Sequence, residues 1–303
     1  MGLQLPELVA STRRRARRLA LLTVLGLSVL LVSGCSADSQ GQLKRLAMPE
    51  PASAQGDATL RLWQGAWIAA LATGFVVWGL IAYVVVRFRR RNDNEIPVQT
   101  RYNLPLEIFY TIAPVIMVIA FFAQTVKTQN TVLEQSPTPD HVVKVVGQKW
   151  SWTFNYTGEQ AVDERNVYVS GTSAVIPKLV LPVGESVRFD LYSPDVIHDF
   201  GVPAFLLKMD VIPGRVNNYE ITPTATGTYR GACYELCGTF HSRMLFTVDV
   251  VTPQEYDAYL QGLLETGVND SDAPILGGND AYTPAGGGLD TIDMLGIDEG
   301  DEQ

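Results

Sequence analysis

The chain has 303 residues, a formal net charge of −9 and 47% hydrophobic residues. This length allows one or two folded domains, and the acidic balance does not suit a nucleic-acid backbone, so no nucleic-acid partner is expected. Three long apolar runs fall in the first half of the sequence. Its relation to a membrane therefore has to be decided before its fold.

Residues 1–34 have the layout of a signal peptide of the lipoprotein type. A basic cluster precedes an uncharged stretch from Leu19 to Leu31, and small residues stand just before Cys35. The expected product begins with a lipidated Cys35 and continues as an exported linker over 35–60. An uncleaved first membrane helix is the alternative. If Cys35 carries lipid, the other two cysteines are left as a pair.

Two further apolar runs predict a transmembrane hairpin over 61–127, with helices at about 63–86 and 104–125. A hydrocarbon core about 30 Å thick needs about 20 helical residues, and both runs can supply them. The segment between the helices is rich in arginine, so the positive-inside rule places it in the cytoplasm. Everything after Lys127 is then expected on the outer, periplasm-like side of a bacterial cell membrane.

The exported half is strongly acidic. From residue 128 onward there are 9 Lys or Arg against 25 Asp or Glu. Nine of these acids lie in 266–303, which is rich in Gly and Asp and is predicted to be a disordered acidic tail. Residues 128–265 remain acidic without it, and this favours the approach of cationic partners.

Residues 128–265 are expected to form the exported folded domain. Short apolar segments punctuated by Gly and Pro predict strands within 141–251, and only residues near 254–264 look helical. The predicted strands are 142–146, 151–156, 175–181, 186–192, 216–221, 227–233 and 244–251. Because no helical crossovers intervene, these strands indicate an all-β antiparallel Greek-key sandwich and not a parallel sheet.

A group of soft metal ligands stands near the end of this predicted sandwich. Cys233, Cys237, His241 and Met244 fall within twelve consecutive positions, and His198 lies 35 residues upstream of Cys233. Thiolates and a thioether favour copper, and imidazole also suits it. One loop could therefore supply four ligands, with the fifth from another part of the chain.

The second cysteine requires an explanation, because a mononuclear blue-copper site needs only one. Two bridging thiolates allow two copper ions, each with one imidazole, and with Met244 and the Glu235 carbonyl as weaker ligands. Such a pair suits electron relay and not catalysis. A Cys233–Cys237 disulfide and a zinc site are the alternatives. Neither requires Met244 at its spacing, and the remaining histidine, His141, is expected at a strand start or on the surface.

The block Cys233 to Met244 resembles the C-x-E-L-C-G-x-x-H-x-x-M signature of cytochrome c oxidase subunit II, and 195–198 resembles that family's upstream histidine segment. The resemblance covers roughly 60–252. It implies a cupredoxin-like domain with a dinuclear copper A centre. The implied ligands are His198, Cys233, Glu235, Cys237, His241 and Met244.

Two other segments carry roles implied by the same resemblance. Trp150, in the aromatic run 147–156, would be the residue through which electrons enter. Glu107, seven residues before Pro114, would lie at a proton-path entrance at the cytoplasmic interface, with an ordinary headgroup-level carboxylate as the alternative. The Glu235 carboxylate would face a magnesium ion at the boundary with subunit I.

The implied function is that of the electron-accepting subunit of a respiratory, proton-translocating oxidase. Its copper would receive electrons from a c-type cytochrome, or from the cytochrome c domain of a bc complex. The haems of subunit I would then take them up for oxygen reduction, so the oxygen site lies elsewhere. Implied partners are subunit I, the other oxidase subunits and the lipid membrane.

Three other functions are alternatives to this interpretation. A quinol oxidase subunit would lack the copper ligands, which are intact here. A nitrous-oxide-reducing enzyme would need a large histidine-rich domain, and the chain has three histidines. A copper carrier would need exposed, exchangeable ligands, whereas a Trp-rich platform and a two-helix anchor favour permanent assembly.

Overall fold

A computed structural model describes residues 22–23, 37–92, 96–267 and 269–277. The chain divides into two units, Met1–Met48 and Pro49–Gln303. In the first unit, helix α2 spans Ala37–Lys44. The predicted lipidation site, Cys35, and nearly all of the predicted signal peptide lie outside the described residues.

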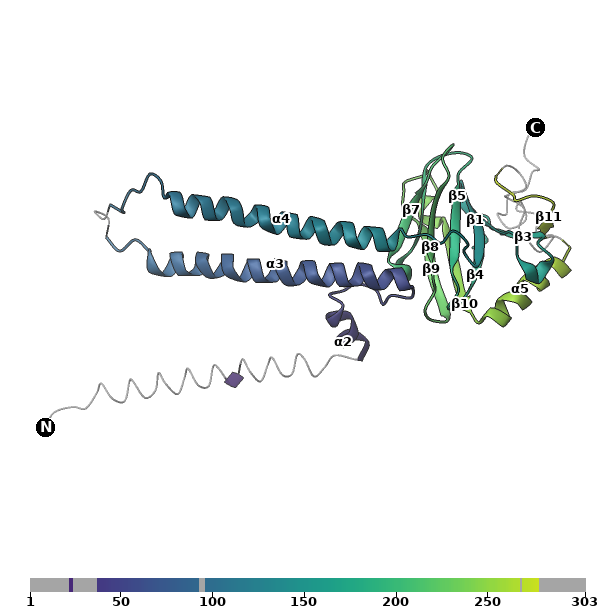
Figure 1. The fold of residues 1–303 in the computed structure, drawn as a ribbon, viewed down its shortest axis with the longest axis horizontal. Coiled ribbons are helices and arrows are strands. Elements are labelled where there is room, and N and C mark those ends of the chain that lie inside the picture. The colour runs from purple at the N-terminus through teal and green to yellow at the C-terminus, as the bar shows by residue number, and fades with distance from the viewer. Residues whose placement is uncertain (1–21, 24–36, 93–95, 268, 278–303) are drawn as a thin grey trace, which may run out of the picture. The chain divides into compact units, whose positions relative to one another are not determined.

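Two long helices form an antiparallel hairpin in the second unit (Figure 1). Helix α3 spans Ala54–Arg87 and helix α4 spans Leu104–Val132. The Ser53 side chain accepts a hydrogen bond from the Gly56 N–H, and the Asn103 side chain accepts one from the Leu106 N–H. Such N-caps satisfy amide groups that have no partner within the helix. Both helices are long and apolar enough to cross a membrane.

The helices are longer than the predicted 63–86 and 104–125, mainly at the end nearer to the sandwich. The start of α3 is held there by hydrogen bonds to distant strands and loops. Ser53 Oγ donates to the Phe205 carbonyl at 3.0 Å, and the Thr222 N–H donates to Gln55 Oε1 at 3.0 Å. Hydropathy marks only the apolar part of a helix, so these polar turns were not predicted.

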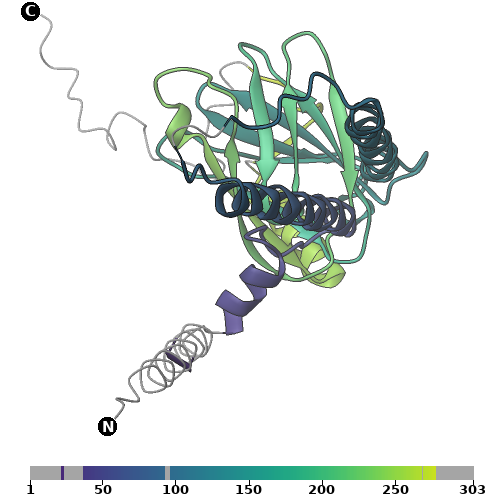
Figure 2. The same cartoon turned by 90° about the vertical axis from the view of Figure 1, so that its left-hand side faces the viewer.

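The rest of the second unit is a sandwich of two β-sheets. Viewed along the hairpin, the two helices appear end-on with the sandwich behind them (Figure 2). The strands are β1 His141–Gln148, β2 Ser151–Tyr156, β3 Asn166–Ser170, β4 Lys178–Pro182, β5 Val187–Tyr192, β6 His198–Val202, β7 Leu207–Val211, β8 Asn217–Ile221, β9 Gly227–Cys233, β10 Leu245–Val251 and β11 Asp270–Ser271.

One sheet has the order β11-β3-β2-β1-β5-β8 and the other β4-β10-β9-β6-β7. The sandwich prediction is confirmed, but its purely antiparallel form is wrong for two pairs. Strands β1 and β5 are parallel, as are β4 and β10. A parallel pair needs a long crossover, and here intervening strands, several of them in the opposite sheet, supply the crossover in place of a helix.

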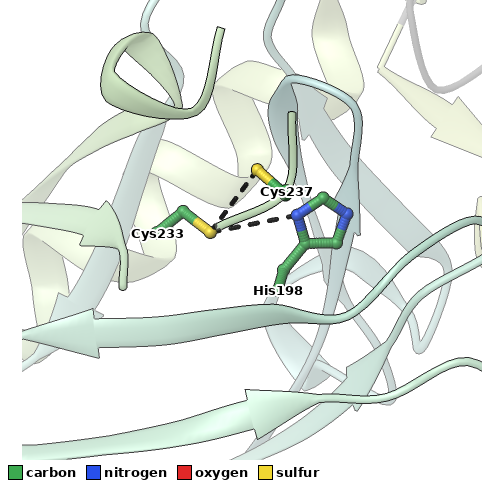
Figure 3. Close-up of side chains that lie close together, drawn as sticks. All are labelled: His198, Cys233 and Cys237. Atoms are coloured by element: carbon green, nitrogen blue, oxygen red, sulfur yellow. Dashed lines mark hydrogen bonds between the residues drawn. The ribbon is translucent and has the colours of Figure 1, made fainter. Parts of the chain in front are cut away.

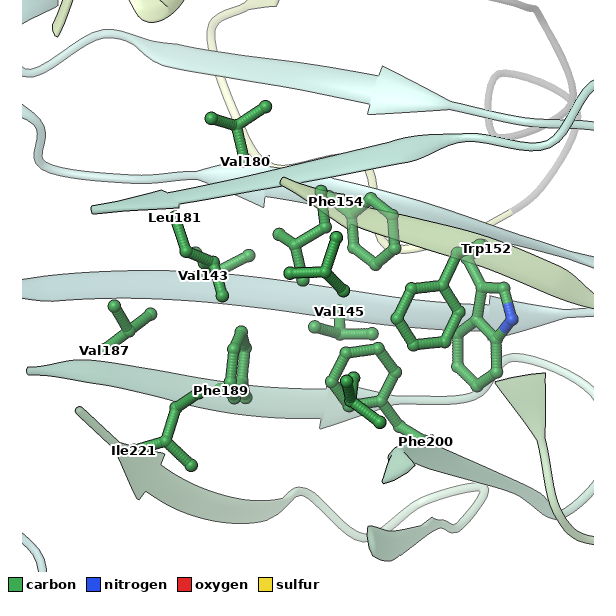
Figure 4. Close-up of a cluster of buried hydrophobic side chains, with 14 of the residues drawn as sticks. Val143, Val145, Trp152, Phe154, Val180, Leu181, Val187, Phe189, Phe200 and Ile221 are labelled. Atoms are coloured by element: carbon green, nitrogen blue, oxygen red, sulfur yellow. The ribbon is translucent and has the colours of Figure 1, made fainter. Parts of the chain in front are cut away.

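Aromatic side chains fill the space between the sheets (Figure 4). Phe200 of β6 stacks on Phe246 of β10, with ring centroids 4.7 Å apart, and Trp152 of β2 contacts both rings edge-on. All three are almost completely buried. Aromatic residues bury large apolar areas, so this cluster holds β2, β6 and β10 in fixed positions beneath the ligand loop.

The C-terminal part closes the open edge of the sandwich. Helix α5 spans Pro253–Glu265, close to the predicted 254–264, and begins with a capping box between Thr252 and Glu255. The structure differs from the expected tail at 269–277, because β11 pairs with β3 and the Asn155 side chain bonds the backbone of Ile275. The amide group of Asn155 donates to the carbonyls of Ile275 and Lys144, and its oxygen accepts the Ile275 N–H. Residues 278–303 lie outside the described part of the chain.

Candidate metal centre

The loop between β9 and β10 brings two sulfur atoms together. Cys233 ends β9, and Cys237 follows on the loop. Their sulfur atoms lie 3.9 Å apart, and both cysteines are free and buried (Figure 3). A disulfide has its sulfurs about 2.05 Å apart, so the pair is not bonded. Both sulfurs remain available as metal ligands.

Each sulfur has an imidazole beside it. Strand β6 pairs with β9, with Phe200 opposite Cys233, and this places His198 Nδ1 3.9 Å from Cys233 Sγ. The short helix η3, His241–Arg243, turns the loop back so that His241 Nδ1 lies 3.5 Å from Cys237 Sγ. Sheet pairing therefore supplies the upstream histidine, and the loop itself supplies the downstream one.

Two weaker donors complete the group. The Glu235 carbonyl oxygen lies 3.2 Å from Cys233 Sγ, and Met244 Sδ lies 3.7 Å from Cys237 Sγ. Met244 is fully buried, and its carbonyl accepts a hydrogen bond from the Trp152 indole at 3.4 Å. All six residues predicted as ligands thus gather around the sulfur pair.

Asp195 orients His198, a role that the sequence analysis missed. Asp195 Oδ1 lies 2.9 Å from His198 Nε2, and Oδ2 accepts the Lys149 N–H at 2.8 Å. With Nε2 donating to the carboxylate, the Nδ1 lone pair faces the sulfurs, as a metal-binding histidine requires. A carboxylate three residues before a predicted histidine ligand was the available signal.

Burial affects the protonation of these groups. It lowers the pKa of His198 despite the nearby Asp195 carboxylate, so the imidazole is held in the neutral form that binds metal. Burial, together with the neighbouring Cys233, raises the pKa of Cys237 to about 12. A metal that displaces this proton must bind thiolate strongly. The donor set of two thiols, two imidazoles and a thioether therefore fits copper.

Trp150 lies directly over the ligand loop. Its indole N–H donates to the Cys237 carbonyl at 3.3 Å, and its ring meets Phe240 edge-on at 5.1 Å. Gly238 has φ +126, and a Cβ there would lie 3.1 Å from the Trp150 indole nitrogen. Gly238 thus provides both the backbone conformation and the space that Trp150 needs. The ligand loop also exposes the side chains of Tyr234, Leu236 and Phe240, here called the apolar rim, and Phe240 of this rim contacts Trp150.

The remaining predicted residues lie elsewhere. Glu107 lies in the first turn of α4, where its carboxylate accepts the Asn103 N–H at 3.0 Å. That contact stabilises the helix start, and nothing in the described structure tests the predicted proton path. His141 begins β1, as expected, and takes no part in the metal centre. Its ring is held instead between Glu159 and Glu185.

Comparison with known proteins gives the same picture for both parts of the chain. Residues 141–251 match the family model "Cytochrome C oxidase subunit II, periplasmic domain", and residues 41–126 match "Cytochrome C oxidase subunit II, transmembrane domain". The two helices are thus transmembrane helices, and the sandwich is a periplasmic domain. A crystal structure of the periplasmic domain of cytochrome oxidase subunit II of Bradyrhizobium japonicum is 29% identical, covers 44% of this chain and 99% of that chain, and has a TM-score of 0.39.

Curated relatives match over most of their length. A probable cytochrome c oxidase subunit 2 of Streptomyces avermitilis is 42% identical over 289 residues, which cover 84% of this chain and 90% of the relative. Cytochrome c oxidase subunit 2 of Mycobacterium bovis is 35% identical over 310 residues, covering 84% of each. With this similarity and with its sulfur and imidazole cluster, the chain belongs to the cytochrome c oxidase subunit II family and is a subunit of that enzyme.

Proposed function

We propose that the ligand loop holds two copper ions and that the subunit relays electrons through them to the haems of subunit I. One observation carries this proposal. Each cysteine sulfur has its own imidazole and its own weaker donor, His198 and the Glu235 carbonyl beside Cys233, His241 and Met244 beside Cys237. A single tetrahedral ion would use only four of these six groups. Six donors arranged as two sets of three suit a pair of ions.

When bound, the copper pair supplies a one-electron redox centre. The protein's part is to keep the ligands in place while the charge changes. His198 is anchored by Asp195 and by sheet pairing, and Met244 is anchored by the aromatic core through Trp152. Ligands that cannot move keep the reorganisation on electron transfer small. The described geometry therefore suits a relay.

Trp150 is proposed as the residue through which electrons enter. It joins an apolar rim, where a docked c-type cytochrome would exclude water, to the carbonyl of a copper ligand. The donor is either a c-type cytochrome or the cytochrome c domain of a bc complex. The Glu235 carboxylate is exposed, and it is proposed to face a magnesium ion at the boundary with subunit I. Glu107 is retained as a proposed proton-path entrance.

The test is metal analysis and electron paramagnetic resonance of the oxidase purified with this chain. Two copper ions per chain are expected at this centre, with a signal delocalised over both. The Cys237→Ser variant should lose the delocalised signal, whereas Thr226→Ser, at an exposed position just before β9, should keep it. One copper per chain with a localised signal contradicts the proposal, and zinc in its place does so too.

A separate proposal concerns the processing of the N-terminus. We infer from the sequence layout that the chain is cleaved before Cys35 and that this cysteine is lipidated. Mass spectrometry of the intact purified chain tests this directly. A mass that includes residues 1–34 contradicts it and favours a retained membrane helix.

A further inference from the structure

Outside the metal centre, a cavity of about 600 Å³ lies between α3 and α4. Its walls are one face of each helix. On α3 the lining positions are 58, 61, 62, 65, 66 and 69, and on α4 they are 117, 120, 121, 124, 127, 128 and 131. These spacings of three and four place each set along a single helical stripe, so the cavity is a groove running along the hairpin.

The lining of the groove is basic and polar at one end and apolar at the other. Its end near the sandwich carries Arg61, Lys127, Thr128 and Thr131, and its other end is lined by small or apolar residues such as Ala69 and Met117. Fourteen residues separate 117 from 131, which is about 21 Å at 1.5 Å per helical residue. That span covers about half of a hydrocarbon core about 30 Å thick, together with a headgroup layer.

The two cations have no carboxylate partner within the part of the chain that the structure describes. Arg61 is followed by the uncharged run 66–86, and Lys127 comes four residues after the apolar part of α4 ends. Both therefore lie at the level where the headgroups of the outer leaflet are expected. Long basic side chains at that level reach phosphate groups while their stems stay in the apolar layer.

We propose that this groove binds one phospholipid of the outer leaflet, with its anionic headgroup between Arg61 and Lys127 and an acyl chain against Ala66, Ala69 and Ala120. Charge complementarity at one end and an apolar lining at the other select an amphiphile with an anionic head. An uncharged transmembrane helix from a neighbouring subunit would leave the two cations without counter-charges. The inference is independent of how many copper ions the centre holds.

The test uses the intact oxidase, purified in mild detergent and examined by native mass spectrometry for retained phospholipids. The wild-type complex should retain an anionic phospholipid that Arg61→Gln/Lys127→Gln binds about 25-fold more weakly. This follows from about fivefold for each cation near a membrane surface. Arg87→Gln/Arg89→Gln removes the same charge at the other end of the hairpin and should retain the outer-leaflet lipid.

A second pair of variants keeps the test decisive if charge loss disturbs assembly. Ala69→Leu places a larger side chain in the groove and should displace the lipid, whereas Ala70→Leu, next to it but outside the lining, should not. Adding phosphatidylglycerol vesicles should restore binding to delipidated wild type, and phosphatidylcholine vesicles should not.

A photoreactive residue at 66 identifies the occupant. Crosslinking to phospholipid supports the proposal, and crosslinking to a peptide of another subunit overturns it. Equal lipid retention by Ala69→Leu and Ala70→Leu also overturns it.

Discussion

At the scale of single residues, the metal centre depends on a carboxylate that is not itself a ligand. The Asp195 carboxylate accepts hydrogen bonds from the N–H groups of Lys149 and Val196 and from the Ser193 hydroxyl, and it contacts His198 Nε2. Burial favours its neutral form, but these hydrogen bonds and His198 outweigh burial and lower its pKa. Asp195 is therefore ionised at neutral pH and fixes the tautomer and the ring orientation of His198.

Asp195→Asn should lower copper affinity by about 10- to 100-fold. The amide can present its NH2 group to His198 Nε2, which would favour the tautomer with a proton on Nδ1, facing the sulfurs. Competition with a chelator of known affinity measures the loss. Asp257→Asn makes the same change on the exposed face of α5 and should have no effect. Equal affinities for the two variants would show that Asp195 does not position His198.

At the scale of elements, α5 is joined to β1 by a buried ionic contact. His141 Nδ1 lies 2.9 Å from Glu159 Oε2, and Nε2 lies 2.8 Å from Glu185 Oε2. Tyr256 of α5 donates to Glu159 at 3.0 Å and packs its ring edge-on against His141. Burial alone would lower the pKa of His141, but Glu159 and Glu185 raise it to about 9.

This raised pKa predicts a loss of stability in base. The folded-state pKa is above the unfolded value of about 6.5, so the contribution is fully present below pH 6.5 and is lost as the pH rises through about 9. The full shift corresponds to about 3 kcal/mol, and solvent screening reduces the expected loss to about 1–2 kcal/mol. Urea unfolding between pH 6 and pH 10 measures it. His141→Gln should flatten this dependence, and a slope equal to that of the wild type contradicts the assignment.

The junction between the hairpin and the sandwich gives a second prediction at this scale. Ser53 is fully buried, caps α3 and bonds the Phe205 carbonyl. Ser53→Ala removes both contacts and should cost about 1–2 kcal/mol of unfolding free energy. Asn103→Ala removes a cap at the exposed start of α4 and should leave the stability of the sandwich unchanged. Equal losses in the two variants would show that the contact with Phe205 contributes nothing.

At the scale of the whole molecule, charge and polarity are divided between its parts. The hairpin is apolar, and the periplasmic half carries 9 basic against 25 acidic residues. A cationic donor would be drawn toward this half by long-range attraction and would then dock on Trp150 and the apolar rim of the ligand loop. Attraction and docking are therefore expected to respond differently to salt.

The rate of reduction by a basic c-type cytochrome should fall as ionic strength rises. The Debye length shortens from about 30 Å at 0.01 M salt to about 3 Å at 1 M, so long-range attraction is screened. Stopped-flow reduction of the purified oxidase measures this, with a small uncharged reductant as the control. A rate that does not change with salt points to a donor that is tethered or fused.

Much of this architecture was predictable from local pattern. Strands β2 and β9 have the predicted limits, and the two transmembrane helices and α5 lie where the hydropathy and the local sequence pattern indicated. The grouping of Cys233, Cys237, His241 and Met244 was predictable, because a single loop holds all four and residues close in the chain stay close in space. The extra turns of α3 and strands β3, β6 and β7 were missed, because contacts with distant segments stabilise them.

The sequence by itself determined the composition of the metal centre, the membrane hairpin and the class of the fold, since these depend on residue type and on short-range periodicity. Only the tertiary structure decided that β1 and β5, and β4 and β10, run parallel, and that Asp195 bonds to His198. It alone placed His141 between two carboxylates and opened a groove between α3 and α4. These features join residues far apart in the chain, and their energies come from packing and burial that no local pattern encodes.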